Sequence, residues 1–599
     1  MRVAASQQRP AVSIYNSLRL IIRQPTLQIM NVSTKGTAQH TYDAIVVGSG
    51  ISGGWAAKEL TEKGLNTLVL ERGRDVKHGD YPTAHLEKWE FPGRNSISQE
   101  SLDRQAKQSR TGYTTREATA HWFVDDVDNP YSEDKAFDWC RGYHVGGRSL
   151  MWGRQSYRLG DLDFEANAKD GFGTDWPVRY KDLKPWYDHV EGFAGISGNN
   201  DGLPQLPDGN FLPPFAMNVL EEHVRDRVAK NFDDRQMINA RVANLSQPHN
   251  GRGGCQYRAR CSRGCPYGAY FSSNSSTLPA AYATERLTLR PFSIVTEVIY
   301  DADTSKAKGV RIIDSETGEA MEYYAKVVFL CASAIASTSI LMNSKSDRFP
   351  NGMGNDSGEL GHNLMDHHFK VGASGRYDGF HDIYYKGRRP TSIYIPRFRN
   401  LGDAATEQKD YVRGFGYQGG GSRTSWTRGV AELARFGADL KADMFAPGDW
   451  RMGIGSWGEH LPYHENRMYL NHDKVDKWGM PTVTFDCEFK ENERNMRKDM
   501  QASAIEMLEV AGLEDVSGFD DPTSAPGLCI HEMGTARMGT SSKNSVLNGH
   551  NQVHGASNVF VTDGAFMTSS ACVNPSLTYM AFTARAADHA VNELNRHNI

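Results

Sequence analysis

The chain has 599 residues and a formal net charge of −5 at pH 7, without any block of like charge. This balance argues against nucleic acid as a partner, and eight cysteines are too few for a disulfide scaffold of this size. No stretch approaches the ~20 apolar residues that a membrane-spanning helix needs, so we expect no span, and the length predicts about two to four domains.

The first 40 residues carry five basic residues and no acidic one. Arg-rich, acid-poor sequence with serines is typical of a transit peptide, but the continuous apolar region and the twin arginine of export signals are missing. We expect residues 1–40 to be a disordered extension, with a transit peptide as the alternative.

Residues 44–47, Ala-Ile-Val-Val, form an apolar run that is typical of a strand covered on both faces. A G-x-G-x-x-G follows, then a helical pattern and a second short strand that ends at Glu71. In this order the elements predict a dinucleotide site: Gly48 makes the tight turn, Gly50 admits the pyrophosphate, and Gly53 lets helix and strand pack closely. Glu71 can accept hydrogen bonds from a ribose diol. The motif alone does not separate NAD from FAD.

A second glycine block lies further along the chain. Gly146 and Gly147, with Ser149 and Trp152 close behind, allow backbone to pass very near a flat ligand. A tight packing turn explains the same residues equally well.

Three cysteines are clustered as C-x5-C-x3-C-P at Cys255, Cys261 and Cys265. Thiolates this close, with intervening arginine and glycine, suit a metal centre, and Cys-Pro often ends a cluster loop. Zinc would normally require a fourth protein ligand, and no histidine is adjacent. Free thiols or one disulfide are the alternatives.

The later elements alternate. The patterns predict a helix at about 216–231, a hairpin leading into a buried strand near 327, and a helix at about 491–512 with methionines on its buried face. The glycine-rich stretch 414–421 lacks the Lys-Ser/Thr of a P-loop, and we expect it to be a turn.

The C-terminal segment contains a short apolar strand that ends in Asp563-Gly564, and later Asn574-Pro575 before a final helix. Asn before the helix and Pro in its first turn are helix-start signals. We expect the N-terminus of this helix to point toward the middle of a flat cofactor.

These motifs together resemble the glucose–methanol–choline (GMC) oxidoreductases, FAD-dependent enzymes that act on alcohols. The resemblance covers about residues 42–599 and rests on the opening fingerprint, the GGRSLMW block at 146–152, the block that ends at His367, the HxMGTxRMG block that starts at His531, and Asn574-Pro575. It implies an α/β fold in which a Rossmann-like FAD-binding domain is interleaved with an α+β substrate-binding domain. The expected segments are 41–160, 246–369 and 523–599 for the FAD-binding domain, and 161–245 and 370–522 for the substrate-binding domain.

The resemblance implies FAD as the cofactor, with His531 and Asn574 as the catalytic pair: a base that takes the hydroxyl proton and an amide that binds the same hydroxyl. Met151 stands where some members attach FAD through a histidine, so we expect noncovalent FAD. Other histidines, including His367 and His368, are expected to be structural. The FAD site is expected at Gly48, Gly50, Ile51, Ser52, Gly53, Glu71, Arg72, Gly146, Gly147, Ser149, Val295, Asp563, Gly564, Asn574, Pro575 and Ser576.

The cysteine spacing is similar to that of bacterial sugar dehydrogenases of this family, which implies a 3Fe-4S cluster on Cys255, Cys261 and Cys265. We therefore expect a sugar or glycoside dehydrogenase, with Gln155, Glu459 and Asn466 as candidate sugar contacts. The same relatives imply a small companion subunit, a cytochrome c-type acceptor and a periplasmic location reached through the companion, or otherwise a cytoplasmic one. The rival hypotheses are an oxygen-using sugar or alcohol oxidase, a redox-neutral FAD-containing lyase, and a noncatalytic flavoprotein.

Overall fold

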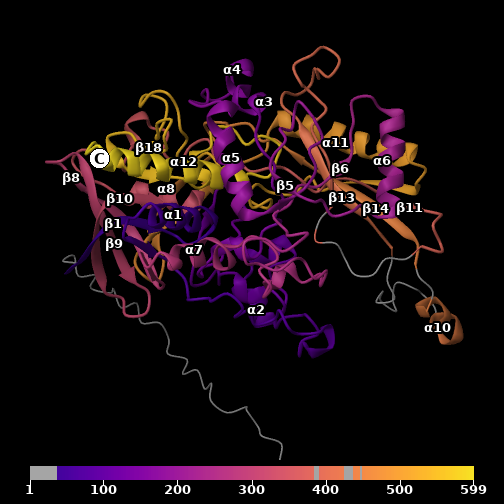
Figure 1. Ribbon diagram of the computed structural model, residues 1–599, viewed down its shortest axis with the longest axis horizontal. Helices are drawn as coiled ribbons and strands as arrows, with labels where there is room; N and C mark the ends of the chain where they lie inside the picture. Colours follow the sequence, from indigo (N-terminus) through magenta and orange to yellow (C-terminus); the bar gives the residue numbers. More distant parts are fainter. Residues whose placement is uncertain (1–36, 384–389, 391, 424–435, 446–447) are drawn as a thin grey trace, which may run out of the picture.

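The computed structural model describes residues 37–383, 390, 392–423, 436–445 and 448–599. Two large sheets lie side by side along the long axis of the molecule (Figure 1). Residues 1–36 of the expected extension lie outside the described residues. The first strand begins at Thr37, so the last four residues of that extension belong to the sheet.

The predicted strand–turn–helix–strand unit is present. Strand β1 (Thr37–Val47) leads through the glycine turn into helix α1 (Ile51–Glu62), and strand β2 (Thr67–Leu70) pairs parallel to β1. The first sheet has the order β18-β19-β10-β1-β2-β7, and a hairpin extends it beyond β10. The other strands are β7 (Leu287–Arg290), β8 (Ser293–Asp301), β9 (Lys306–Asp314), β10 (Ala320–Leu330), β18 (Gln552–Val553) and β19 (Ala556–Val561).

The turn after β1 requires glycine at two positions. Gly48 has φ of +92°, and a Cβ there would lie 2.6 Å from the Cys331 carbonyl oxygen. A Cβ on Gly53 would lie 1.9 Å from the Gly48 carbonyl oxygen. Neither contact is possible, so α1 can pack this closely against the end of β1 only with glycine at both sites.

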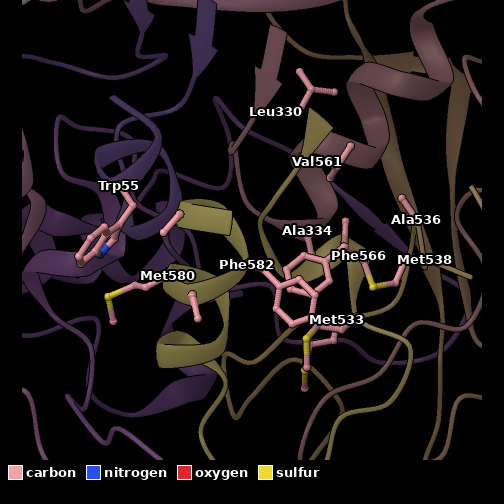
Figure 2. Packing of buried hydrophobic residues seen from close by; sticks show 14 of the residues in the cluster. Trp55, Leu330, Ala334, Met533, Ala536, Met538, Val561, Phe566, Met580 and Phe582 are labelled. Carbon is pink, nitrogen blue, oxygen red and sulfur yellow. The ribbon is translucent and has the colours of Figure 1, made fainter. Parts of the chain in front are cut away.

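Helices cover the first sheet. Figure 1 shows α1 and the C-terminal helix α12 (Ser576–Asn595) close to it, together with α7 (Thr277–Ala283) and α8 (Ala334–Asn343). Ala56, Ala57 and Leu60 of α1 are buried, as the helical pattern predicts. In the core between sheet and helices, the rings of Phe566 and Phe582 pack together with centroids 4.5 Å apart (Figure 2).

The second sheet has the order β17-β11-β14-β13-β12-β6 and is antiparallel. Its strands all fall within 161–245 and 370–522: β6 (Ile238–Asn239), β11 (Val371–Tyr377), β12 (Ile393–Ile395), β13 (Phe415–Arg423), β14 (Trp450–Gly458) and β17 (Glu514–Asp520). Helices α6 (Val219–Asn231) and α11 (Glu491–Val510) pack beside it. Met496, Met500 and Met507 are fully buried, as the methionine face of α11 predicts.

The prediction of a turn at 414–421 is wrong, because Phe415–Arg423 is strand β13 at the centre of the second sheet. Gly420 pairs with Gly453 of β14, and a Cβ on Gly419 would lie 2.1 Å from the Gly453 carbonyl oxygen. Tight strand packing, and not a turn, explains the glycines here.

The remaining helices are α2 (Gln99–Arg104), α3 (Asp161–Phe164), α4 (Ala166–Asp170), α5 (Tyr180–Ala194) and α10 (Gly437–Phe445). The remaining strands form two small sheets, one of β3 (Ser132–Glu133), β15 (Arg467–Val475) and β16 (Pro481–Asp486), and one of β4 (Ile196–Ser197) and β5 (Phe211–Leu212). Helix α5 is joined to α12 by a hydrogen bond of 2.8 Å between Tyr187 Oη and Thr578 Oγ1. Among the described helices, none is long and apolar enough to cross a bilayer.

Candidate active site

One deep cavity begins at the carboxyl ends of β1 and β2 and extends to the start of α12. It is lined by every residue predicted for the FAD site except Gly53 and Gly146, and also by His531. Those two glycines lie behind the lining: Gly53 packs on Gly48, and the Gly146 N–H donates to Ser49 Oγ at 2.9 Å. Ligands of open α/β sheets bind at this edge, where a strand order reverses.

His531 and Asn574 meet at this cavity. They lie 43 residues apart in the chain, yet Asn574 Nδ2 is 3.4 Å from His531 Nε2. The Asn574 Oδ1 accepts a hydrogen bond of 2.6 Å from Gln418 Nε2 on β13. Since Gln418 occupies the amide oxygen, the amide N–H₂ of Asn574 faces the histidine.

The inner nitrogen of His531 contacts His367, with the two Nδ1 atoms 2.8 Å apart. His367 Nε2 lies 2.9 Å from the Ala571 carbonyl oxygen, so Nε2 carries the proton and Nδ1 of neutral His367 accepts. Burial lowers the pKa of His367 to about 4, which keeps the ring neutral. These partners therefore assign the His531 proton to Nδ1 and direct its Nε2 lone pair toward the cavity and the Asn574 amide.

Burial also lowers the pKa of His531 well below 6.5, and the neighbouring His367 and Arg148 side chains lower it further. Its backbone is fixed by Asp366, whose carboxylate accepts N–H groups from Gly527 at 2.8 Å, Cys529 at 3.0 Å and His531 at 3.0 Å. The segment 527–531 is thus held on the residue that precedes His367.

Three comparisons with known proteins, with family models, with curated relatives and with solved structures, bear on this geometry. Models of the N-terminal and C-terminal parts of the GMC oxidoreductases match residues 42–369 and 462–583. The chain is a GMC oxidoreductase. This membership establishes an oxidoreductase of CH–OH donors and implies FAD.

The relatives of this GMC oxidoreductase are distant. It is 27% identical to 2-methyl-1,2-propanediol dehydrogenase of Mycolicibacterium austroafricanum, over 92% of this chain and 96% of the relative. It is 26% identical to the fructose dehydrogenase large subunit of Gluconobacter japonicus, over 92% and 98%. The solved structure of formate oxidase from Aspergillus oryzae shares the fold, with a TM-score of 0.59 and 14% identity over 94% of this chain and all of the other.

The cavity fits FAD on three observations. A Cβ added to Gly50 would meet no atom within 4 Å, so the backbone at the start of α1 is open to a phosphate group. Tyr579 Oη is buried at the cavity without a hydrogen-bond partner, and so are Nε and Nη1 of Arg154. Such orphaned polar atoms await a polar ligand. Glu71 lies at the cavity edge, where Ser49 and Gly73 donate to its carboxylate.

Arg148 and Glu532 close another part of the cavity wall. The guanidinium Nη1 and Nη2 lie 3.1 and 2.7 Å from the two carboxylate oxygens, a bidentate pair. Burial alone would lower the pKa of the Arg148 guanidinium, but the charge and hydrogen bonds of Glu532 outweigh burial and raise that pKa above its usual range. The pair joins the GGRSLMW block to the segment that carries His531.

Sequence reasoning missed three residues of this site. His367 was expected to be structural but contacts His531 directly, and Asp366 and Gln418 were not singled out. The block that ends at His367 was one of the family motifs and was the available signal, whereas nothing in the sequence marks Gln418. His368 is fully buried beside Gly458, and neither of its ring nitrogens has a hydrogen-bond partner.

The candidate sugar contacts separate into two groups. Gln155 lines the cavity. Glu459 is buried in an ion pair of 2.7 Å with Arg413, and Asn466 donates to His460 and to the Glu488 carbonyl oxygen. Neither Glu459 nor Asn466 lines the cavity, and the polar atoms of both are engaged by neighbouring protein groups.

The cysteine loop, residues 255–265, forms a second, smaller cavity. Cys255, Cys261 and Cys265 all line it, all three are half-buried, and no disulfide joins any of the eight cysteines in the described chain. Burial raises the pKa of Cys255 to about 11, and burial also raises the pKa of Cys265. Arginines of the loop fasten it to the segment 84–87 through the Ala84 and Leu86 carbonyl oxygens and the Glu87 carboxylate.

This loop lies directly behind the glycine block at the FAD cavity. Tyr270 Oη donates to the Leu150 carbonyl oxygen at 2.5 Å and lies 3.3 Å from the Cys261 carbonyl oxygen. Trp152, which lines the FAD cavity, donates from Nε1 to the Phe271 carbonyl oxygen at 2.9 Å. Two tandem residues, Tyr270 and Phe271, therefore connect the two cavities.

Proposed function

We propose that this enzyme is an FAD-dependent dehydrogenase that oxidises a hydroxyl group of a sugar or glycoside, with His531 as the base and with electrons leaving through the cysteine loop. The observation that carries the proposal is the hydrogen-bond arrangement of His531: its partners assign its proton to Nδ1, and its Nε2 lone pair faces the cavity beside Asn574 Nδ2.

His531 suits the role of base because of its environment. A lowered pKa keeps the imidazole neutral at neutral pH, so Nε2 is available to take the hydroxyl proton of an alcohol. As the proton arrives, the Nδ1–H bond to His367 orients the ring, and the Asn574 amide holds the substrate oxygen. Bound FAD supplies the acceptor for the hydride that leaves the carbinol carbon.

For the cysteine loop we propose a 3Fe-4S cluster. Among the histidine, cysteine and acidic side chains of the described residues, one set of three has all its ligand atoms within 4.8 Å of one another. That set is His367, Cys529 and His531, and it does not include the cysteine loop. The three thiol sulfurs of the loop therefore do not all lie within 4.8 Å of one another, whereas one zinc ion holds sulfurs about 3.8 Å apart at its Zn–S distance of ~2.3 Å. A larger cluster can bridge that spread, and nearby arginines offset its negative charge.

The position of the loop supports an electron route out of the enzyme. Its thiols are half-buried and near the surface, whereas the backbone at Leu150 is connected to the loop through Tyr270. The relative from Gluconobacter is named as a large subunit, which supports a companion subunit here. We extend this to a cytochrome c-type acceptor and to a periplasmic location reached with the companion.

The sugar assignment is supported by that same relative, which is named for fructose, and by Gln155 at the cavity. The decisive experiment is anaerobic mixing of the flavin-loaded protein with a panel of sugars, glycosides and simple diols while flavin bleaching is recorded. We expect at least one sugar or glycoside to bleach the flavin, with slow reoxidation by oxygen and fast reoxidation by an artificial one-electron acceptor. Bleaching by the diols alone would overturn the sugar assignment, and fast turnover with oxygen alone would make the enzyme an oxidase.

A further inference from the structure

We propose that His367, Cys529 and His531 form a binding site for a thiophilic divalent metal such as Zn²⁺, and that metal bound there inactivates the enzyme. The inactivation rests on the function proposed above for His531, whereas metal binding itself does not.

The ligand atoms already have nearly the spacing that zinc needs. The Nδ1 atoms of His367 and His531 are 2.8 Å apart, the Cys529 Sγ lies 3.4 Å from His531 Nδ1, and all three atoms fall within 4.8 Å of one another. Tetrahedral zinc, with nitrogen at ~2.0–2.1 Å and sulfur at ~2.3 Å, places its ligand atoms roughly 3.3–3.6 Å apart. Shifts of under about 1 Å would complete the set, and water can fill the fourth position.

The surroundings of the three ligands also suit a metal. A metal-bound histidine usually donates its other N–H to a carbonyl or carboxylate, and His367 Nε2 already donates to the Ala571 carbonyl oxygen. Asp366 fixes the backbone N–H groups of both Cys529 and His531. Two of the three ligands are thus oriented from one carboxylate before any metal arrives.

Binding moves protons but no electrons. The Cys529 thiol releases one proton to solvent, and the metal takes the place of the proton between the two Nδ1 atoms. That proton exchanges through water to Nε2 of His531, because a neutral imidazole with metal on Nδ1 carries its hydrogen on Nε2. Nε2 then has no lone pair for the substrate hydroxyl, so metal occupancy and base function exclude each other.

Access to the site is restricted. His367 is 1% exposed and Cys529 is 5% exposed, and only His531 of the three lines the FAD cavity. A metal must therefore pass the imidazole ring of His531, and we expect inhibition to develop over time and not at the moment of mixing.

The test uses the flavin-loaded full chain, incubated anaerobically with Cd²⁺ or Zn²⁺. Cd²⁺ reports binding through its thiolate charge-transfer absorbance, independently of turnover. Three proteins are compared: the wild type, Cys529→Ser, and Cys487→Ser as a control at another buried cysteine. Because the free thiols of the cysteine loop can also bind Cd²⁺, the informative quantity is the absorbance difference between proteins. Each activity is divided by that of the same protein without metal.

We expect Zn²⁺ to inhibit the wild type and the control equally, with reversal by a chelator, and to inhibit Cys529→Ser at least about tenfold more weakly. The Cd²⁺ absorbance of Cys529→Ser should be lower by one site. Equal inhibition and equal absorbance in all three proteins would overturn the proposal. If Cys529→Ser folds poorly, Cys529→Ala gives the same comparison. If the enzyme is an active dehydrogenase but wild type and Cys529→Ser have the same Cd²⁺ absorbance, only the metal site is overturned. If the two proteins differ in Cd²⁺ absorbance but no substrate reduces the flavin, only the proposed function is overturned.

Discussion

The site around His531 and the cysteine loop are built in opposite ways. The histidine site collects groups from four separate stretches of chain, at 366–367, 418, 527–531 and 571–574, and hydrogen bonds fix each of them. The cysteine loop takes all three thiols from eleven consecutive residues. In the first site the partners of each ring nitrogen assign the protons without a ligand, whereas the chemistry proposed for the second site requires a cluster.

This difference has consequences for mutation. If His531 is the base, we expect a change in the histidine site to alter the reduction of flavin by substrate. On the proposed electron route, we expect a change in the cysteine loop to alter the departure of electrons and to leave flavin reduction intact. Rates of flavin reduction and of acceptor reduction, measured separately, therefore test whether the two sites are as independent as their construction suggests.

The largest effect is expected for His531→Ala. Loss of a positioned base lowers the rate by about 10²–10⁴-fold, so flavin reduction in anaerobic stopped flow should fall by a factor in that range while FAD remains bound. His472→Ala, at an exposed histidine, is the control and should behave as the wild type. A fall of less than tenfold in His531→Ala would remove the histidine from the role of base.

A smaller loss is expected for His367→Leu, which removes the acceptor for the His531 Nδ1–H and lets the proton move to Nε2. We expect flavin reduction to slow by about a hundredfold, because the wrong tautomer has no base facing the substrate. His367→Gln retains an oxygen acceptor and an N–H₂ for the Ala571 carbonyl, and should recover most of the rate. If both variants are equally slow, His367 supports the packing and not the tautomer.

The same contrast explains what the sequence could predict. The local pattern of apolar residues and glycines was enough to place β1, α1 and β2, and most of the predicted FAD-site residues line the cavity. The three cysteines of the loop line one small cavity, as their closeness in sequence suggests, and their role as cluster ligands stays a prediction.

Contacts between distant segments could not be read in this way. Gln418 lies in a glycine-rich stretch that was expected to be a turn, and it reaches Asn574 only because that stretch is a central strand. His367 lies 164 residues from its partner His531, and its role depends on the direction of the Ala571 carbonyl. Local propensity carries no information on either contact, because tertiary packing determines both.

For the cysteine loop, Cys261→Ser should lower the rate of external acceptor reduction by about tenfold or more, because one-electron transfer then lacks a complete set of cluster ligands. Flavin reduction by substrate should change by less than about twofold, since the histidine site is separate. Iron and sulfide analysis should show loss of the cluster, and Cys487→Ser is the matched control at a buried cysteine. Equal acceptor rates in Cys261→Ser and wild type would rule out the proposed electron route.

The smallest effect concerns pH and separates two buried groups of the histidine site. Burial lowers the pKa of His531 well below 6.5, so protonation of the base costs activity only at pH values well below that. Burial, with Glu532 nearby, raises the pKa of Asp366 to about 7. As pH falls through about 7, the Asp366 carboxylate gains a proton and holds the three N–H groups of segment 527–531 less well.

We expect flavin reduction to drop a few-fold near pH 7, and Asp366→Asn to remove that step while keeping the loss at low pH. Stability should run the other way: because the folded-state pKa of Asp366 is raised, its contribution favours folding below pH 3.8 and is lost as pH rises to about 7. If the step in flavin reduction near pH 7 persists in Asp366→Asn, another group causes that step, and protonation of Asp366 does not loosen segment 527–531.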